Sequence, residues 1–128
     1  MKITQLNHVA LHVVDVDRSV AFYRDVLGLE VADRPDFGFP GAWFRIGDAS
    51  SPSGIQEVHL ICREIKDPTP PRERHFAFMV DDIEAFAQDL TRRGIEHQGP
   101  KPRPDGAKQV FLRDPDDHVI ELCTPATS

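Results

Sequence analysis

An internal repeat constrains the fold of this 128-residue chain more than any other feature. Residues 7–31 read NHVALHVVDVDRSVAFYRDVLGLEV, and residues 74–97 read RHFAFMVDDIEAFAQDLTRRGIEH. Near its start each segment has a histidine on an alternating apolar run. Asp residues, an amphipathic stretch and a glycine follow. Alternation predicts a strand and the helical spacing of apolar residues predicts a helix, so the chain carries two copies of one unit.

The rest of each half completes the unit in the same order. Strands are predicted at 3–14, 29–32, 42–47 and 55–62, and again at 75–80, 95–98, 108–113 and 118–123. One helix follows the first strand of each half, beginning at Asp15 or Asp17 in one copy and at Asp81 or Asp82 in the other. Gly28 and Gly94 are the predicted helix ends. Each half therefore reads strand, helix, strand, strand, strand.

A proline-rich segment divides the chain nearly in half. We interpret residues 1–65 as the first module, 66–73 as a linker and 74–128 as the second module of a single domain spanning 1–128. Neither module could bury its sheet alone, so the two must pack together or exchange with another chain. We predict an α+β fold in which two paired βαβββ modules form a curved mixed β-sheet cup with helices outside.

Composition excludes several classes of protein. The formal charge is −6, with 21 acidic against 15 basic residues, which argues against nucleic acid or an anionic membrane as partner. No apolar run approaches the roughly 20 residues that span a bilayer. Met1 and Lys2 lead straight into an alternating run, so we expect no signal peptide and a cytoplasmic protein. In that compartment Cys62 and Cys123 are expected as free thiols.

Four matched positions of the repeat carry metal-ligand side chains. His8 aligns with His75 at the start of each first strand, and His59 aligns with Glu121 in each fourth strand, EVHLIC against HVIELC. Each residue alone would be an ordinary polar side chain. Together, on two modules related by a pseudo-two-fold axis, they predict one divalent metal site of three imidazoles and a carboxylate. Such a set suits Zn, Ni, Co, Mn or Fe, and we predict no organic cofactor.

The chain resembles the vicinal oxygen chelate superfamily, which includes glyoxalase I, bleomycin-resistance proteins and extradiol dioxygenases. The matching motifs are NHVALHVVDVDRSVAFYRDVLGLEV, EVHLI, HFAFMVDDIEAFAQDL and FLRDPDDHVIEL. The resemblance implies that His8, His59, His75 and Glu121 hold the ion and that Glu121 doubles as catalytic base. It also implies a homodimer, because similar small members pair their modules across two chains. One departure is Asp117, where the family commonly has glycine; Asp tolerates the left-handed backbone of such a turn.

The resemblance leaves several activities open. We favour a metal-dependent lyase or isomerase acting on a small oxygenated, possibly thiol-conjugated, substrate through a metal-stabilised enolate. An extradiol dioxygenase would use two His and one Glu, and His59 is an extra imidazole. A fosfomycin-type thiol transferase would have Thr where Ala10 stands. A bleomycin-resistance-like protein would only bind its small molecule. Cationic candidates for substrate recognition are Arg45, Arg72, Arg74, Lys101, Arg103 and Lys108, and Glu57 shares a face with His59.

Overall fold

The computed structural model describes residues 1–47 and 56–127. The predicted loop at 48–54 lies outside these residues. The chain divides into two compact units, Met1–Asp67 and Pro68–Ser128, and each is described by itself.

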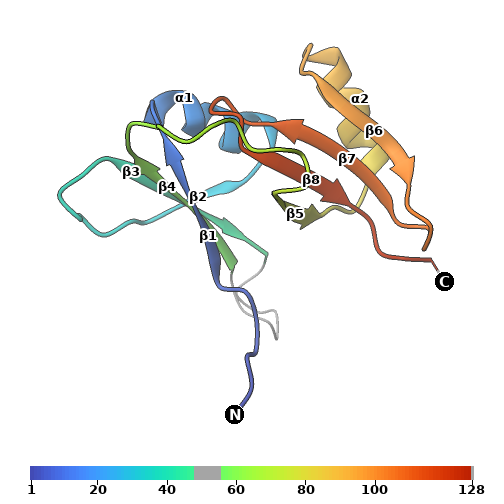
Figure 1. The fold of residues 1–128 in the computed structure, drawn as a ribbon, viewed down its shortest axis with the longest axis horizontal. Helices are drawn as coiled ribbons and strands as arrows, with labels where there is room; N and C mark the ends of the chain where they lie inside the picture. Colours follow the sequence, from blue (N-terminus) through green and yellow to red (C-terminus); the bar gives the residue numbers. More distant parts are fainter. Residues whose placement is uncertain (48–55, 128) are drawn as a thin grey trace. The chain divides into compact units, whose positions relative to one another are not determined.

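The first unit contains a four-stranded mixed sheet and one helical segment (Figure 1). Strand order is β1-β4-β3-β2; β1 runs parallel to β4, and the remaining pairs are antiparallel. Along the chain the elements are β1 (His8–Val13), α1 (Val16–Ala21), a π-helical turn η1 (Phe22–Val26), β2 (Glu30–Ala32), β3 (Gly41–Ile46) and β4 (Gln56–Cys62).

The second unit repeats this topology. Its strand order is β5-β8-β7-β6, and β5 runs parallel to β8 as β1 does to β4. The elements are β5 (His75–Met79), α2 (Ile83–Arg92), β6 (His97–Pro102), β7 (Lys108–Arg113) and β8 (Val119–Cys123). Both halves are therefore βαβββ modules, and the predicted α+β class with paired modules is confirmed.

Both helices begin at an aspartate and are followed by a left-handed glycine. The Asp15 carboxylate accepts a hydrogen bond from Arg18 N at 3.0 Å, and the Asp82 carboxylate accepts one from Ala85 N at 3.0 Å. These side chains satisfy backbone donors that have no partner in the first turn. Gly28 has φ +75° and Gly94 has φ +70°, a conformation that disfavours residues with a Cβ. The predicted helix ends are confirmed at both places.

Each sheet has one face covered by its own helix and one face that carries the histidines. In the first unit α1 lies against β3 and β4, and in the second α2 lies against β6 and β7 (Figure 1). Strand alternation puts apolar side chains on the covered faces, where they pack against apolar side chains of the helices. The side chains on this side that are fully or almost fully buried are Val13, Tyr23, Phe44, Val58 and Leu60 in one unit, and Leu90, Val110, Leu112, Ile120 and Leu122 in the other. The opposite faces, here called the histidine faces, are where the site residues lie.

Two strand predictions were wrong in extent. The strand predicted at 3–14 runs only from His8 to Val13. Its paired register with β4 begins with His8 opposite Glu57, and the Asn7 carbonyl before it accepts a hydrogen bond from Glu57 N at 3.0 Å. The strand predicted at 95–98 instead runs His97–Pro102, through residues expected in a loop. Pro100 and Pro102 are tolerated because β6 is an edge strand, where one row of N–H donors is not needed. A register shift between Gln98 and Lys101 accommodates the intervening residues.

Cys62 and Cys123 are free thiols, as predicted. Among residues 1–47 and 56–127, every helix is too short or too polar to cross a membrane.

Candidate metal centre

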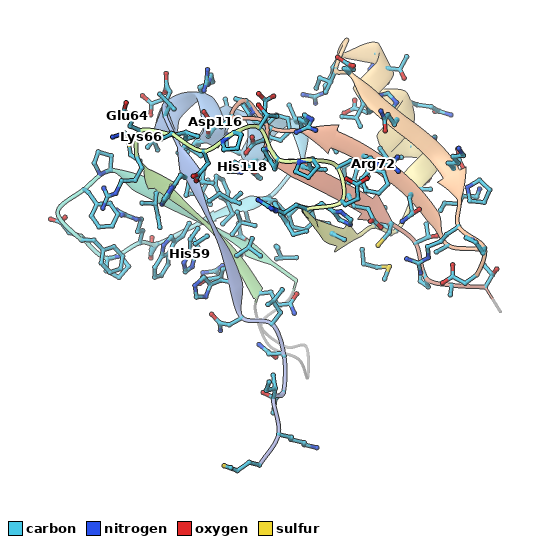
Figure 2. The ribbon with its side chains drawn as sticks, viewed as in Figure 1. His59, Glu64, Lys66, Arg72, Asp116 and His118 are labelled. Carbon is cyan, nitrogen blue, oxygen red and sulfur yellow. The ribbon has the colours of Figure 1, made fainter. Side chains whose placement is uncertain are left out.

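The first unit brings His8 and His59 together on its histidine face. Their rings are stacked, with centroids 4.2 Å apart and planes 19° apart. The indole of Trp43, directly opposite His59 on β3, stacks on the same imidazole at 4.1 Å and 6°. Two near-parallel rings at this spacing cannot share one side of the imidazole, so His59 lies between His8 and Trp43. Figure 2 labels His59 on β4. Its side chain is only 13% exposed.

Glu57 adds a carboxylate to this pair. Its Oε1 lies 3.0 Å from Nε2 of His59, two residues along the same strand. Glu57 also faces His8 across the β1–β4 pair. The histidine face of the first unit therefore has two imidazoles and a carboxylate along the β1–β4 pair.

The second unit brings His75 and Glu121 together. His75 Nε2 lies 2.9 Å from Glu121 Oε1, and the amide of Gln109 donates to Glu121 Oε2 at 3.2 Å. The edge of Phe111, opposite Glu121 on β7, contacts His75 with ring centroids 5.2 Å apart. A buried carboxylate without partners would be costly. Glu121 is 5% exposed and has a polar partner at each oxygen.

The two pairs occupy equivalent positions of the repeat. His59 lies opposite Ala10, two residues after His8, and Glu121 lies opposite Ala77, two residues after His75. The strand on the other side supplies an aromatic ring in both cases, Trp43 and Phe111. The register thus reproduces the alignment made from the sequence.

Hydrogen bonds orient both first-strand imidazoles in the way that metal ligands require. His8 Nδ1 lies 2.8 Å from Asn7 Oδ1, and His75 Nδ1 lies 2.9 Å from the carbonyl oxygen of Arg72. Both oxygens can accept a hydrogen bond from an imidazole N–H. Metal-binding histidines commonly donate this second N–H to an oxygen, which leaves Nε2 as the donor to the ion.

His75 and Glu121 form a candidate ligand pair. Nε2 of His75 lies 2.9 Å from Oε1 of Glu121, which is the length of an ordinary hydrogen bond. An imidazole nitrogen and a carboxylate oxygen are both ligand types for a divalent cation.

The four predicted ligands are thus found as two pairs, one in each unit. Within the described residues, no group of three or more His, Cys, Asp and Glu side chains is close enough to hold an ion. Each unit by itself supplies two of the four predicted metal ligands.

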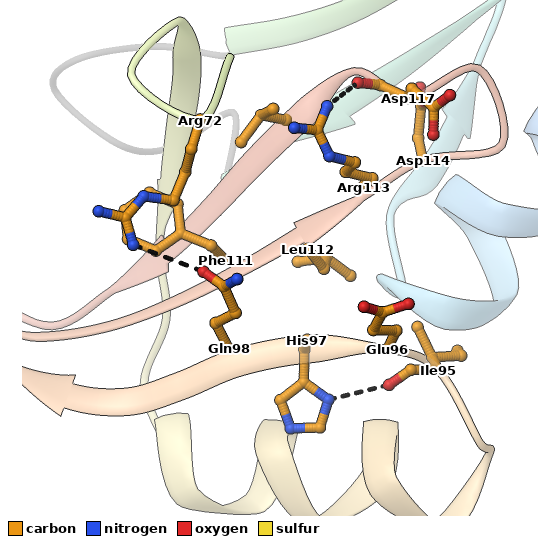
Figure 3. A pocket seen from close by; sticks show the side chains of 11 residues that line it. Arg72, Ile95, Glu96, His97, Gln98, Phe111, Leu112, Arg113, Asp114 and Asp117 are labelled. Carbon is orange, nitrogen blue, oxygen red and sulfur yellow. Dashed lines mark hydrogen bonds between the residues drawn. The ribbon is translucent and has the colours of Figure 1, made fainter. Parts of the chain in front are cut away.

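The second unit has a cavity of about 310 Å³, and Figure 3 shows the residues that line it. Arg72 and Phe111 line it, and both also contact His75. The guanidinium of Arg72 lies over the Phe111 ring at 5.0 Å and donates to the Gln98 side chain at 3.4 Å. The cavity therefore offers a small molecule an aromatic and cationic wall next to a candidate ligand.

Sequence reasoning missed several supporting residues. Asn7 precedes β1, which begins at His8, so strand alternation gives no prediction for its side chain. Gln109 and the carbonyl of Arg72 had no signal in the sequence, because their roles depend on the β7–β8 pairing and on the path of the chain before β5. Trp43 and Phe111 flank the candidate ligands, which depends on the pairing of β3 with β4 and of β7 with β8.

Comparison with known proteins establishes the class. The signature of the glyoxalase/bleomycin resistance protein/dioxygenase superfamily matches residues 5–122. The chain belongs to this superfamily.

Three similar proteins illustrate the range of its relatives. Glyoxylase I 4 of Arabidopsis thaliana is 31% identical over 132 residues, covering 96% of this chain and 72% of the relative. Metallothiol transferase FosB of Staphylococcus epidermidis is 31% identical over 127 residues, covering 97% and 84%. A crystal structure of a glyoxalase family protein from Bacillus anthracis is 27% identical, with a TM-score of 0.79 and 97% of both chains covered.

Proposed function

We propose that this protein is a metal-dependent enzyme of the glyoxalase superfamily, a lyase or isomerase acting on a small oxygenated substrate. His8, His59, His75 and Glu121 would hold one divalent ion, such as Zn, Ni, Co, Mn or Fe. The observation that carries the proposal is the equivalence of the His8–His59 and His75–Glu121 pairs in the register of the two units.

The proposed chemistry divides between the ion and the chain. The ion would act as a Lewis acid that stabilises negative charge developing on substrate oxygen. Glu121 would take a proton from an acidic C–H of the substrate at one carboxylate oxygen. Gln109 donates to Oε2 and would keep the carboxylate oriented while the proton moves. The Arg72 carbonyl would hold the His75 ring in place through Nδ1.

Two features of the site count against a dioxygenase. His59 adds a third imidazole to the two histidines and one glutamate that such an enzyme uses. An extradiol dioxygenase would also be expected to have a tyrosine near the last strand. Tyr23, the one tyrosine of the chain, is instead fully buried on the helix side of the first unit.

Thiol addition is a second candidate, favoured by the likeness to a metallothiol transferase. Against it stands Ala10, opposite His59, because its methyl group has no hydroxyl to offer a substrate. The Glu121 carboxylate contacts His75 through one oxygen and the Gln109 amide through the other. A protein that only binds its small molecule would have no need of a carboxylate held in this way.

The deciding experiment combines metal analysis with three substrate types. The purified protein would be analysed for metals, stripped by a chelator and reloaded with single ions. Each form would be assayed with a thiohemiacetal of a 2-oxoaldehyde, with a catechol in the presence of oxygen, and with an epoxide plus thiol. We expect metal-dependent turnover of the thiohemiacetal. Full activity of the stripped protein, or metal-dependent turnover of only the catechol or the epoxide, would overturn the lyase proposal.

We also propose that the protein forms a homodimer. In their own sheets β1 and β5 are edge strands, and both have exposed residues on the histidine face, including His8, Ala10 and Ala77. Exposed edges of this kind are commonly covered by another chain or segment. Sedimentation equilibrium would give twice the 14.4 kDa chain mass if the proposal holds, and the chain mass if it does not.

A further inference from the structure

Arg45 lies on the histidine face of the first unit without a partner for its Nε. It stands two residues after Trp43 on β3, so both side chains point to the same face. The residue is half-buried, and its Nε atom is buried with no hydrogen-bond partner. Among the residues described, this is the one buried side-chain nitrogen or oxygen left without a partner.

Two glutamates face Arg45 from the neighbouring strands. Glu30 on β2 and Glu57 on β4 are its direct register partners. In the described part of the chain neither forms an ion pair with Arg45, and Glu57 pairs with His59 instead. A guanidinium has five N–H donors, and a buried donor left without an acceptor destabilises the fold.

The equivalent arginine of the second unit is used differently. Arg113 stands two residues after Phe111, as Arg45 does after Trp43. Its guanidinium donates to the carbonyl oxygens of Pro70 at 3.0 Å and Asp117 at 2.8 Å. It therefore ties the segment before β5 to the turn between β7 and β8. Arg45 has no such structural role among the described contacts.

We propose that Arg45 binds a carboxylate of the substrate, so that the substrate is a small organic acid. This inference rests on the proposed function, since it places the substrate's metal-binding oxygens at His59. The Cα atoms of diagonal neighbours on adjacent antiparallel strands, such as Arg45 and His59, are about 7–8 Å apart. A small acid could span a distance of this order if its carboxylate lies a few bonds from the two neighbouring oxygens that would bind the ion. Arginine suits this task because its fork of donors matches a carboxylate.

The single tryptophan provides a direct readout, because Trp43 stacks on His59 and stands two residues before Arg45 on the same face. Its fluorescence would be titrated with 2-oxoglutarate and with 2-oxopentanoate, which has a methyl group in place of the distal carboxylate. We expect 2-oxoglutarate to bind about 10- to 100-fold more tightly. Arg45→Gln should abolish this preference, and Arg45→Lys should restore only part of it. Arg24→Gln is the matched control, since Arg24 is exposed and pairs with Asp25.

The titration separates this inference from the proposed function. Metal content would be measured for each variant, and the titration repeated on metal-free protein. Normal metal loading in Arg45→Gln with a lost preference supports the inference. Failure of the wild type to take up metal would overturn the proposed function. The preference for 2-oxoglutarate over 2-oxopentanoate would still be measured on the metal-free protein, so the role of Arg45 is tested separately. Equal affinity for the two acids, no binding of either, or an unchanged preference in Arg45→Gln would each overturn the role of Arg45.

Discussion

Nε2 of His75 and Oε1 of Glu121 lie 2.9 Å apart, and the other nitrogen of the same imidazole is engaged by the Arg72 carbonyl. This pair joins the first strand of the second unit to its last strand at the one buried carboxylate on that histidine face. It provides a proton acceptor beside a candidate metal ligand. The proposed base role of Glu121 follows from this position.

Glu121→Gln should therefore reduce turnover about 10²- to 10⁴-fold while the fold is kept. Glutamine has nearly the same shape and can still hydrogen-bond to His75 and Gln109, but it cannot accept the substrate proton. Steady-state kinetics and circular dichroism would measure the two effects. Glu96→Gln is the control, because Glu96 is an exposed carboxylate at the nearby cavity. A Glu121→Gln protein with wild-type turnover would eliminate the base role.

Asn7→Ala should weaken metal binding about 10- to 100-fold. The Asn7 side-chain oxygen lies 2.8 Å from Nδ1 of His8, so removing it frees the ring to rotate. Competition with a fluorescent chelator would give the affinities. Gln5→Ala, a change in the same segment before β1, should leave the affinity unchanged. Equal affinities for Asn7→Ala and wild type would show that the Asn7–His8 contact does not orient a ligand.

Asp117→Gly should stabilise the protein by about 0.5–1 kcal/mol. Asp117 has φ +68°, the left-handed conformation predicted for it, and glycine adopts that conformation without steric cost. Its carbonyl bond to Arg113 would remain. The neighbouring change Asp116→Gly should destabilise, since it adds backbone freedom to the unfolded chain without relieving a positive φ. Urea unfolding of both variants tests this, and a loss of stability in Asp117→Gly would contradict it.

The Cys123 thiol should react slowly with alkylating reagents. Burial raises the pKa of the Cys123 thiol, and the negative charge of Glu121 raises it further. Since the thiolate is the reactive form, a raised pKa lowers its population at any given pH below that pKa. The alkylation rate of Cys123 would be measured against pH in a Cys62→Ser background. The pH at which this rate reaches half its maximum should be higher for the native than for the urea-unfolded protein. A native midpoint at or below the unfolded one would rule out this environment.

Local patterns were sufficient to predict most of the architecture. The order of elements and the turns at Gly28 and Gly94 follow from alternation and positive-φ preferences, which act over a few residues. Capping preferences narrowed each helix start to two aspartates, and the structure selects Asp15 and Asp82. The extent of β6 did not follow from them. Its prolines are compatible with a strand only because β6 is at the edge of its sheet, and edge position is a property of the assembled sheet.

For the candidate site, alternation along a strand predicts which side chains share a face. Comparison of the two halves predicts that His59 and Glu121 are equivalent positions of a repeat. The stacking of Trp43 on His59, the support of Glu121 by Gln109 and the missing partner of Arg45 Nε could not be predicted in this way. These contacts join residues of different strands. They depend on sheet register and side-chain packing, which no short stretch of sequence specifies.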